Sequence, residues 1–149
     1  MGSADGIQEG LMRLCLMIEG QEGVTWNDWM SLAAATEASG LEGLFRSDHY
    51  LGIGNKEGSS IDAWTTLAGL AARTEYVQLG TMVSPATFRH PSVLAKSVVT
   101  VDHISNGRAE LGIGAGWYLG EHRAYGFPFA DAKTRMAVLA KQIEIVTKS

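Results

Sequence analysis

A regular alternation of short apolar runs with helix-like stretches is the feature that most limits how this 149-residue chain can fold. Each apolar run is rich in β-branched or bulky residues and is followed by a stretch with helical spacing; the runs cover Met12–Ile18, Leu41–Phe45, Val77–Val83 and Ala109–Ile113. They start about 32 residues apart on average. Because strands that alternate with helices at this spacing form parallel sheets with right-handed crossovers, the pattern predicts four successive βα units and an α/β fold.

Local signals predict where the four helices begin and end. Thr25 and Asp28 form a capping pattern for a first helix that stops at Ser39–Gly40, and Ser59 with Asp62 forms the same pattern for a second. A proline in the first turn suits the third helix, where its missing N–H is not needed. The last two helices are expected from Pro91 to a stop at Asn106–Gly107, and from Ala132 to about Thr147.

Four βα units fit two architectures, an open doubly wound sheet or part of a βα barrel. In both, ligands bind at the carboxyl ends of the strands. Three of the predicted strand ends are polar or rich in glycine, with the sequences LFRSDHYLG, GTMVSPATFRHP and LGIGAGWYLGEH. These ends are expected to converge on one rim of the sheet.

Each candidate at that rim has two interpretations. Asp48 and His49 are either a turn and helix-cap pair or an acid and base for proton transfer. Gly112, Gly114 and Gly116 alternate, so they do not match the dinucleotide fingerprint G-x-G-x-x-G. They indicate either a ligand lying close to the backbone or a tightly packed strand. Trp117 either stacks on a ring or plugs the end of a barrel.

Composition and charge exclude several classes of protein. With 46% hydrophobic and 19% charged residues the chain is typical of a globular domain, and its net charge of −4, with scattered lysines and arginines, predicts no nucleic-acid partner and no membrane partner. No apolar run approaches the roughly 18 residues of a membrane span, and no signal peptide is recognisable, so a cytoplasmic location is expected. The four histidines lack metal-ligand spacing, so no metal site is predicted. Cys15 lies in an apolar run and is expected to be a buried small hydrophobe.

Several motifs together resemble the luciferase-like monooxygenase superfamily, and most closely its branch that uses the deazaflavin coenzyme F420. They occur in the family's order and read LFRSDHYL, DAWTTLAGLAART, LGTMVSPATFRHPSVLAKSV, ELGIGAGW and EHRAYGFPF. The likeness extends from about Leu11 to about Val146.

This resemblance implies a TIM-type (β/α)8 barrel. A complete barrel takes about 250 residues, so residues 11–149 are expected to form its N-terminal half, a half-barrel of about four units, after a flexible segment at residues 1–10. A half-barrel leaves two sheet edges and an apolar face open. Pairing as a homodimer or with a complementary half-barrel is therefore expected.

The resemblance also implies roles for particular residues. Asp48 and His49 are expected to line the cofactor site as catalytic residues, with His49 transferring a proton beside the hydride-carrying ring. A bulge with a cis peptide bond at Met82–Val83 is expected to support the back of that ring. The remaining expected cofactor contacts are Thr81, Met82, Val83, Gly114, Ala115, Gly116 and Trp117. The family's sugar-phosphate dehydrogenases carry an acid in place of Trp117, which predicts a different substrate and mechanism here.

The resulting functional hypothesis is an F420-dependent oxidoreductase that transfers a hydride between the deazaflavin and a small organic substrate. One alternative is an FMN-dependent monooxygenase of the same superfamily. Another is a non-catalytic half-barrel that serves as a binding or interaction module. An open-sheet nucleotide-binding domain is disfavoured by the glycine spacing.

Overall fold

A computed structural model describes residues 12–54 and 60–148. The expectations for residues 1–10 and for a cap at Ser59 lie outside these ranges. The elements in chain order are β1 (Cys15–Ile18), α1 (Trp26–Ala38), β2 (Gly43–Arg46), α2 (Ala63–Ala71), β3 (Gln78–Pro85), α3 (Pro91–Ser105), β4 (Ala109–Gly114), α4 (Leu119–Tyr125) and α5 (Ala132–Val146). All four predicted strands are present.

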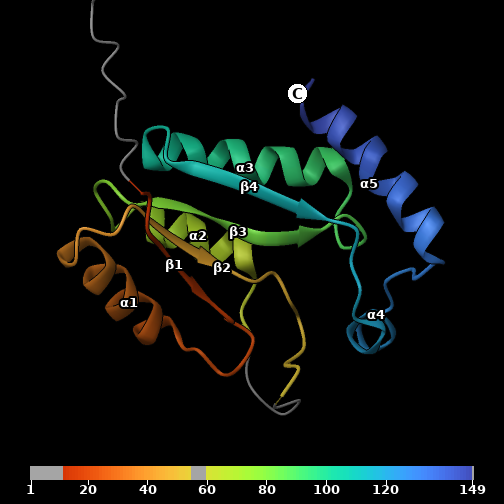
Figure 1. The fold of residues 1–149 in the computed structure, drawn as a ribbon, viewed down its shortest axis with the longest axis horizontal. Coiled ribbons are helices and arrows are strands. Elements are labelled where there is room, and N and C mark those ends of the chain that lie inside the picture. The colour runs from red at the N-terminus through yellow and green to blue at the C-terminus, as the bar shows by residue number, and fades with distance from the viewer. Residues whose placement is uncertain (1–11, 55–59, 149) are drawn as a thin grey trace, which may run out of the picture.

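The strands form one parallel sheet in the order β1-β2-β3-β4. Right-handed crossovers between strands in this order place every connecting helix on the same face, whereas a doubly wound sheet needs its strand order to reverse. Figure 1 shows α1, α2 and α3 along one face of the sheet, with α5 packed beside α3. The described strands therefore have the arrangement of four consecutive units in the wall of a (β/α) barrel.

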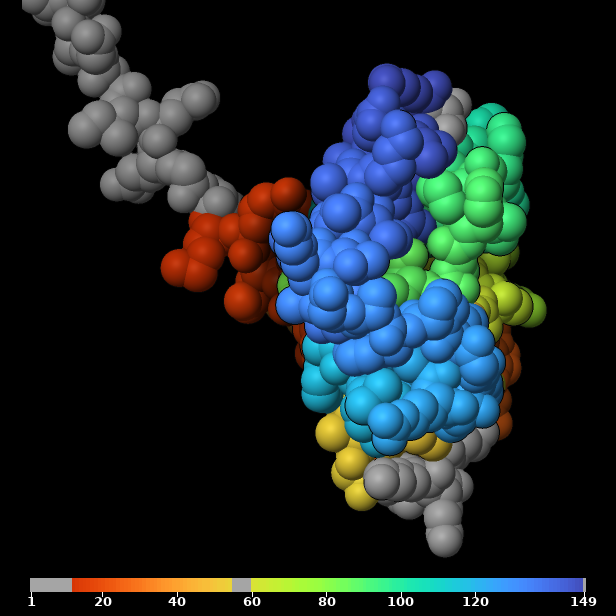
Figure 2. All heavy atoms as spheres, turned by 90° about the vertical axis from the view of Figure 1, so that its right-hand side faces the viewer, coloured from red at the N-terminus to blue at the C-terminus, as the bar shows by residue number. Residues whose placement is uncertain are grey.

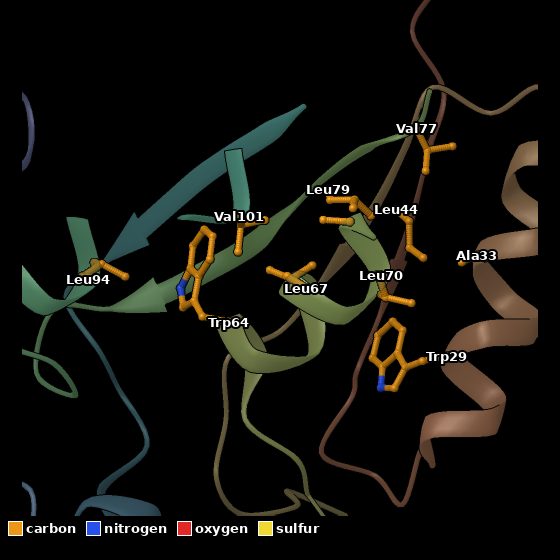
Figure 3. Close-up of a cluster of buried hydrophobic side chains, with 11 residues drawn as sticks. Trp29, Ala33, Leu44, Trp64, Leu67, Leu70, Val77, Leu79, Leu94 and Val101 are labelled. Atoms are coloured by element: carbon orange, nitrogen blue, oxygen red, sulfur yellow. The ribbon is translucent and has the colours of Figure 1, made fainter. Parts of the chain in front are cut away.

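The hydrophobic core fills the space between this sheet and its helices (Figure 3). Leu44 and Leu79 point from the sheet toward Leu67 and Leu70 of α2. Trp29 and Trp64 are also buried. Fully burying a large apolar side chain contributes about 1.5 to 3 kcal/mol, so this cluster holds the helices firmly against the strands.

Two helix predictions need correction. The second helix is capped by Asp62 itself, whose carboxylate accepts from the Thr65 N–H. The short helix α4 was not predicted, because its two buried residues are Glu121 and His122 and give no apolar period. Its end is fixed by Gly126, which adopts the left-handed conformation with φ of 72°.

The prediction that Cys15 is buried is wrong. Side chains alternate along a strand, and Cys15 shares its face with Gly43 and Phe45 rather than with the leucines of the core. No helix of the described ranges covers that face, so Cys15 is exposed. Met82 and Val83, which are 54% and 43% exposed, also lie beside the groove on this side. We call this surface the open face.

Candidate functional site

The carboxyl ends of the four strands meet at one rim. Figure 2 looks onto this rim and shows α4 and the segment that follows it lying in front of the sheet. The segment after β2 reaches α4 through a hydrogen bond from the Tyr125 hydroxyl to the Tyr50 carbonyl, 2.9 Å long. The predicted convergence of strand ends is therefore present.

A cavity of about 370 Å³, which we call the rim pocket, opens there. Its walls are formed by Glu19, Ser47, His49, Ile53, Met82, Val83, Pro85, Gly114, Ala115, Gly116 and Trp117. Of the nine residues predicted for the site, all except Asp48 and Thr81 are in this set. The peptide bond between Met82 and Val83 is cis, as the resemblance implied.

One wall of the rim pocket comes from the contact between β3 and β4. The register of β3 shifts between Thr81 and Ser84, which is a bulge that redirects the strand. A side chain on Gly114 would bring its Cβ within 2.7 Å of Val83, so this glycine is required for packing against the bulge. Gly116 has φ of 76°, a conformation that glycine adopts most readily. Close strand packing therefore explains Gly114, which also lines the pocket.

The opposite side of the rim pocket carries a carboxylate–imidazole pair. His49 Nδ1 lies 2.8 Å from one carboxylate oxygen of Glu121, and the other oxygen accepts the Tyr50 N–H at 3.1 Å. Glu121 is fully buried. Burial lowers the pKa of His49, but the hydrogen bond and charge of Glu121, with the charges of Glu19 and Asp48, outweigh that effect and leave the pKa raised. The pair therefore favours a proton on this imidazole.

Trp117 forms the lip of the rim pocket. It is 61% exposed, contacts the edge of His49 with ring centroids 5.9 Å apart, and stacks on Tyr118. An exposed indole beside an imidazole is suited to contact with a ligand ring.

Asp48 lies on the other side of the rim, away from the pocket. Arg89 forms two hydrogen bonds to its carboxylate, of 2.5 and 3.1 Å, and a third, of 2.6 Å, to Asp62 at the start of α2. Ser84 also donates to Asp48, at 2.6 Å. We call Asp48, Asp62, Ser84 and Arg89 the outer network. It ties the ends of β2 and β3 to a helix N-terminus and leaves the Asp48 carboxylate fully engaged.

Thr81, the other predicted residue outside the rim pocket, is buried. Its hydroxyl donates to the Gly112 carbonyl at 3.0 Å and lies 3.1 Å from the Ser84 hydroxyl, whose own hydrogen is donated to Asp48. It also borders a groove on the open face. Thr81 therefore braces the strand just before the bulge.

The sequence analysis missed Ile53 and Pro85 of the pocket lining and three polar residues of the site. Glu19 and Ser47 follow β1 and β2 directly, and the rule that strand ends carry chemistry could have found both. They are joined through Gln21, which donates to Glu19 and accepts from the Ser47 hydroxyl. Glu121 lies in a helix that has no apolar period, so only the EHRAYG motif pointed toward it.

Other sites are less suited to chemistry. A larger groove of about 560 Å³ lies between α2 and α3, but its acid and its arginine, Asp62 and Arg89, already bind each other in the outer network. In residues 12–54 and 60–148, no three histidine, cysteine, aspartate or glutamate side chains cluster as a metal site would require. Within the same ranges, no helix has the length and apolar character to cross a membrane. The rim pocket thus remains the candidate site.

Comparisons with known proteins find the same family that the sequence motifs resemble. The profile of the luciferase-like monooxygenase family matches residues 12–146. An F420-dependent glucose-6-phosphate dehydrogenase from Amycolatopsis mediterranei (strain U-32) is 35% identical over 120 residues, which are 80% of this chain and 36% of that protein. The chain thus spans about a third of the length of this curated relative.

Two solved structures, each 26% identical in sequence, superpose on most of this chain. A monooxygenase from Streptomyces bottropensis superposes with a TM-score of 0.75 at 26% identity, over 92% of this chain and 42% of that one. A coenzyme F420 dependent tetrahydromethanopterin reductase from Methanopyrus kandleri superposes with a TM-score of 0.63 at 26% identity, over 78% of this chain and 30% of that one.

Proposed function

The chain belongs to the luciferase-like monooxygenase family, and on that premise we propose that it functions in a coenzyme F420-dependent oxidoreductase. The reaction is a hydride transfer between the deazaflavin and a small organic substrate. One observation carries the proposal: among the described residues that line the rim pocket, His49 is the one imidazole, and it shares the lining with Met82, Val83 and glycine backbone. The F420-dependent relative supports the choice of cofactor.

The residues of the rim pocket fit the ring of such a cofactor. Gly114 and Gly116 bring the backbone to the pocket surface, so a planar ring can lie directly against it. Met82 and Val83 are exposed and apolar there. These groups can support a ring face without offering it competing hydrogen bonds.

The described lining of the rim pocket does not fit the phosphate-bearing tail of the cofactor. Among the described residues that line the rim pocket there is no lysine or arginine, although phosphates in proteins are usually held by cations or backbone N–H groups. We therefore propose that the tail is bound outside the described part of this chain. The carboxyl-terminal strands of a complete barrel would lie in a suitable position.

Within this site His49 is proposed to move the proton that accompanies hydride transfer. The bound deazaflavin supplies the hydride chemistry. His49 holds a proton beside it, with Glu121 behind the imidazole and Trp117 across its edge. Glu19, which is exposed and lines the pocket, offers a further polar contact to a substrate. Asp48 is proposed to support this arrangement from the outer network rather than to touch the ligand.

The substrate is proposed to differ from a sugar phosphate. The described lining of the rim pocket contains the carboxylate of Glu19 and no lysine or arginine, which disfavours an anionic substrate. Trp117 adds a large apolar surface at the mouth. An uncharged organic molecule with a hydroxyl or carbonyl group fits these surroundings.

A titration of the purified protein with coenzyme F420, followed by its fluorescence and compared with FMN, tests the proposal. We expect saturable binding of F420 in the micromolar range or tighter and weaker binding of FMN. Binding of FMN alone, with oxygen consumption, would instead support the monooxygenase alternative, which the Streptomyces bottropensis structure also favours. A folded protein that binds neither would be a binding or interaction module.

The open face is proposed to pack against a second half-barrel. Its apolar residues include Met82 and Val83, and the exposed thiol of Cys15 lies on the same side. Covering this face would bury apolar surface and protect the sheet edges. Sedimentation analysis is expected to show a dimer, whereas a monomer at all concentrations would require the covering half to come from another chain.

A further inference from the structure

We propose that Glu121 is a positioning residue that fixes the tautomer of His49, so that Nδ1 always carries hydrogen and Nε2 alone exchanges a proton with a ligand in the rim pocket. The catalytic consequence rests on the proposed function. The tautomer itself does not, because it is a property of the protein without any ligand.

The hydrogen-bond partners of Glu121 dictate this tautomer. The backbone N–H of Tyr50 can only donate, so it takes one carboxylate oxygen, at 3.1 Å. The second oxygen lies 2.8 Å from His49 Nδ1 and, in the ionised carboxylate, can only accept. A neutral His49 must therefore place its hydrogen on Nδ1. Its Nε2 lone pair is left for the pocket.

Nε2 is free to act in this way. In residues 12–54 and 60–148 it has no hydrogen-bond partner, while the ring borders the rim pocket. When the imidazole is neutral, Nε2 accepts a proton from a substrate hydroxyl; when it is protonated, Nε2–H donates to a substrate oxygen. Nδ1–H stays on Glu121 in both states. One nitrogen thus serves both directions of the reaction.

The helix that carries Glu121 is held so that this geometry persists. His122, the next residue, bonds the Tyr118 carbonyl through Nδ1 and the Thr87 hydroxyl through Nε2, each at 2.7 Å. The Tyr125 hydroxyl donates to the Tyr50 carbonyl. These contacts fix α4 to the segment after β3 and to the segment that contains His49. A proton-transfer group keeps its orientation when the residues that contact it directly are held in place.

The charged groups around His49 act in the same direction. Glu121 approaches from α4, Glu19 from the end of β1, and Asp48 from the same segment as His49. All three carry negative charge when ionised, and each favours the protonated imidazole. Glu121 is the one in hydrogen-bond contact, so it alone can select the nitrogen.

Replacing Glu121 with glutamine makes a sharp test, because the amide cannot satisfy both partners as the carboxylate does. The Tyr50 N–H still requires an acceptor and takes the amide oxygen. The amide NH₂ then faces Nδ1 and can only donate, which forces the hydrogen of the neutral ring onto Nε2. We expect ¹⁵N NMR of the imidazole, recorded above its pKa, to report the Nδ1–H tautomer in the unchanged protein and the Nε2–H tautomer in E121Q.

Turnover with F420 should fall by about 10² to 10⁴-fold in E121Q, the range for a positioned proton transfer, while F420 affinity stays within about threefold. Tyr125→Phe is the matched control, because it removes another bond between α4 and the same segment without touching His49. It should leave the tautomer unchanged.

The outcomes separate the two proposals. An Nε2–H tautomer in the unchanged protein would overturn the positioning role, even if E121Q failed to fold. Equal loss of turnover in Tyr125→Phe and E121Q, with the same tautomer in both, would also overturn it. Failure to bind F420 with the Nδ1–H tautomer present would leave the positioning role intact and remove only the proposed function.

Discussion

Asp48 and His49 are neighbours in the sequence but belong to two regions of the rim with different physical character. Asp48 points into the outer network, where Arg89 and Ser84 occupy its carboxylate. His49 points into the rim pocket, where one ring nitrogen is bound by Glu121. The outer network is thus fully paired within the protein, whereas the rim pocket keeps an atom available.

This difference gives a criterion for polar residues at strand ends: it separates those that stabilise the fold from those that can take part in a reaction. Both residues are largely buried and both have charged partners. What distinguishes them is whether the partners use every polar atom of the side chain. Variants of the outer network should therefore lose stability, whereas variants of the rim pocket should lose turnover.

The largest expected effect belongs to the rim pocket. His49→Asn keeps a donor where Nδ1 lies, so Glu121 retains its partner, but removes the nitrogen that exchanges protons. Turnover should fall by about 10² to 10⁴-fold, which is about 3 to 5 kcal/mol in activation free energy. At a pH above the folded pKa of His49, the free energy of unfolding should change by less than about 1 kcal/mol. Steady-state kinetics and urea unfolding measure both, and turnover within tenfold of the unchanged protein would contradict the role of His49.

The matching variant in the outer network should show the opposite pattern. Arg89→Ala leaves the carboxylate of Asp48 buried without its cation, and breaking a buried pair in this way costs about 3 to 5 kcal/mol of unfolding free energy. Lys141→Ala is the control, because its pair with Glu144 is exposed and should matter by less than about 1 kcal/mol. If urea unfolding showed equal losses for the two variants, the outer network would have no special structural role.

The sequence predicted the fold better than it predicted the division between these regions. Apolar runs followed by helical spacing identified all four strands, since strands of parallel sheets are typically apolar on both faces. The same pattern misplaced Cys15, because an apolar run does not reveal which face its neighbours leave uncovered. Asp48 was grouped with His49 for a related reason. Adjacent residues after a strand can point to opposite sides, and only the partners Arg89 and Glu121, distant in sequence, decide which.

A glycine that follows β4 tests the same comparison through a change in the backbone. Gly116→Ala should cost about 1 to 2 kcal/mol of unfolding free energy, because a side chain is strained at φ of 76°. Its Cβ would also lie 2.8 Å from the Thr87 hydroxyl. Gly126→Ala is the matched control, with φ of 72° but no atom within 4 Å of the new Cβ.

Both glycine variants should lose stability through backbone strain, Gly116→Ala more because of its contact with Thr87. Only Gly116→Ala should weaken F420 binding, by about tenfold or 1.4 kcal/mol. Fluorescence titration of the two variants makes the measurement. Unchanged affinity in Gly116→Ala would show that the glycine serves strand packing alone.

The smallest expected effect is a pH dependence of stability that belongs to the rim pocket and not to the outer network. Burial alone would lower the pKa of His49, but Glu121 and the other nearby carboxylates raise it in the folded protein. The folded state then binds more proton than the unfolded state between the ordinary histidine pKa of about 6.5 and the higher folded pKa. The stabilisation is complete below this window and is lost as pH rises through it. Each unit of pKa difference corresponds to about 1.4 kcal/mol.

Urea unfolding at a series of pH values on both sides of 6.5, for the unchanged protein and for His49→Asn, isolates this contribution, because the two proteins differ only in this side chain. The unchanged protein should lose more stability than His49→Asn as pH rises through the window. Glu121→Gln should lose the extra slope as well, since it removes the charge that raises the pKa. Parallel curves for all three proteins would mean that Glu121 does not stabilise the imidazolium, and the contrast between a satisfied outer network and a proton-holding rim pocket would then rest on hydrogen bonding alone.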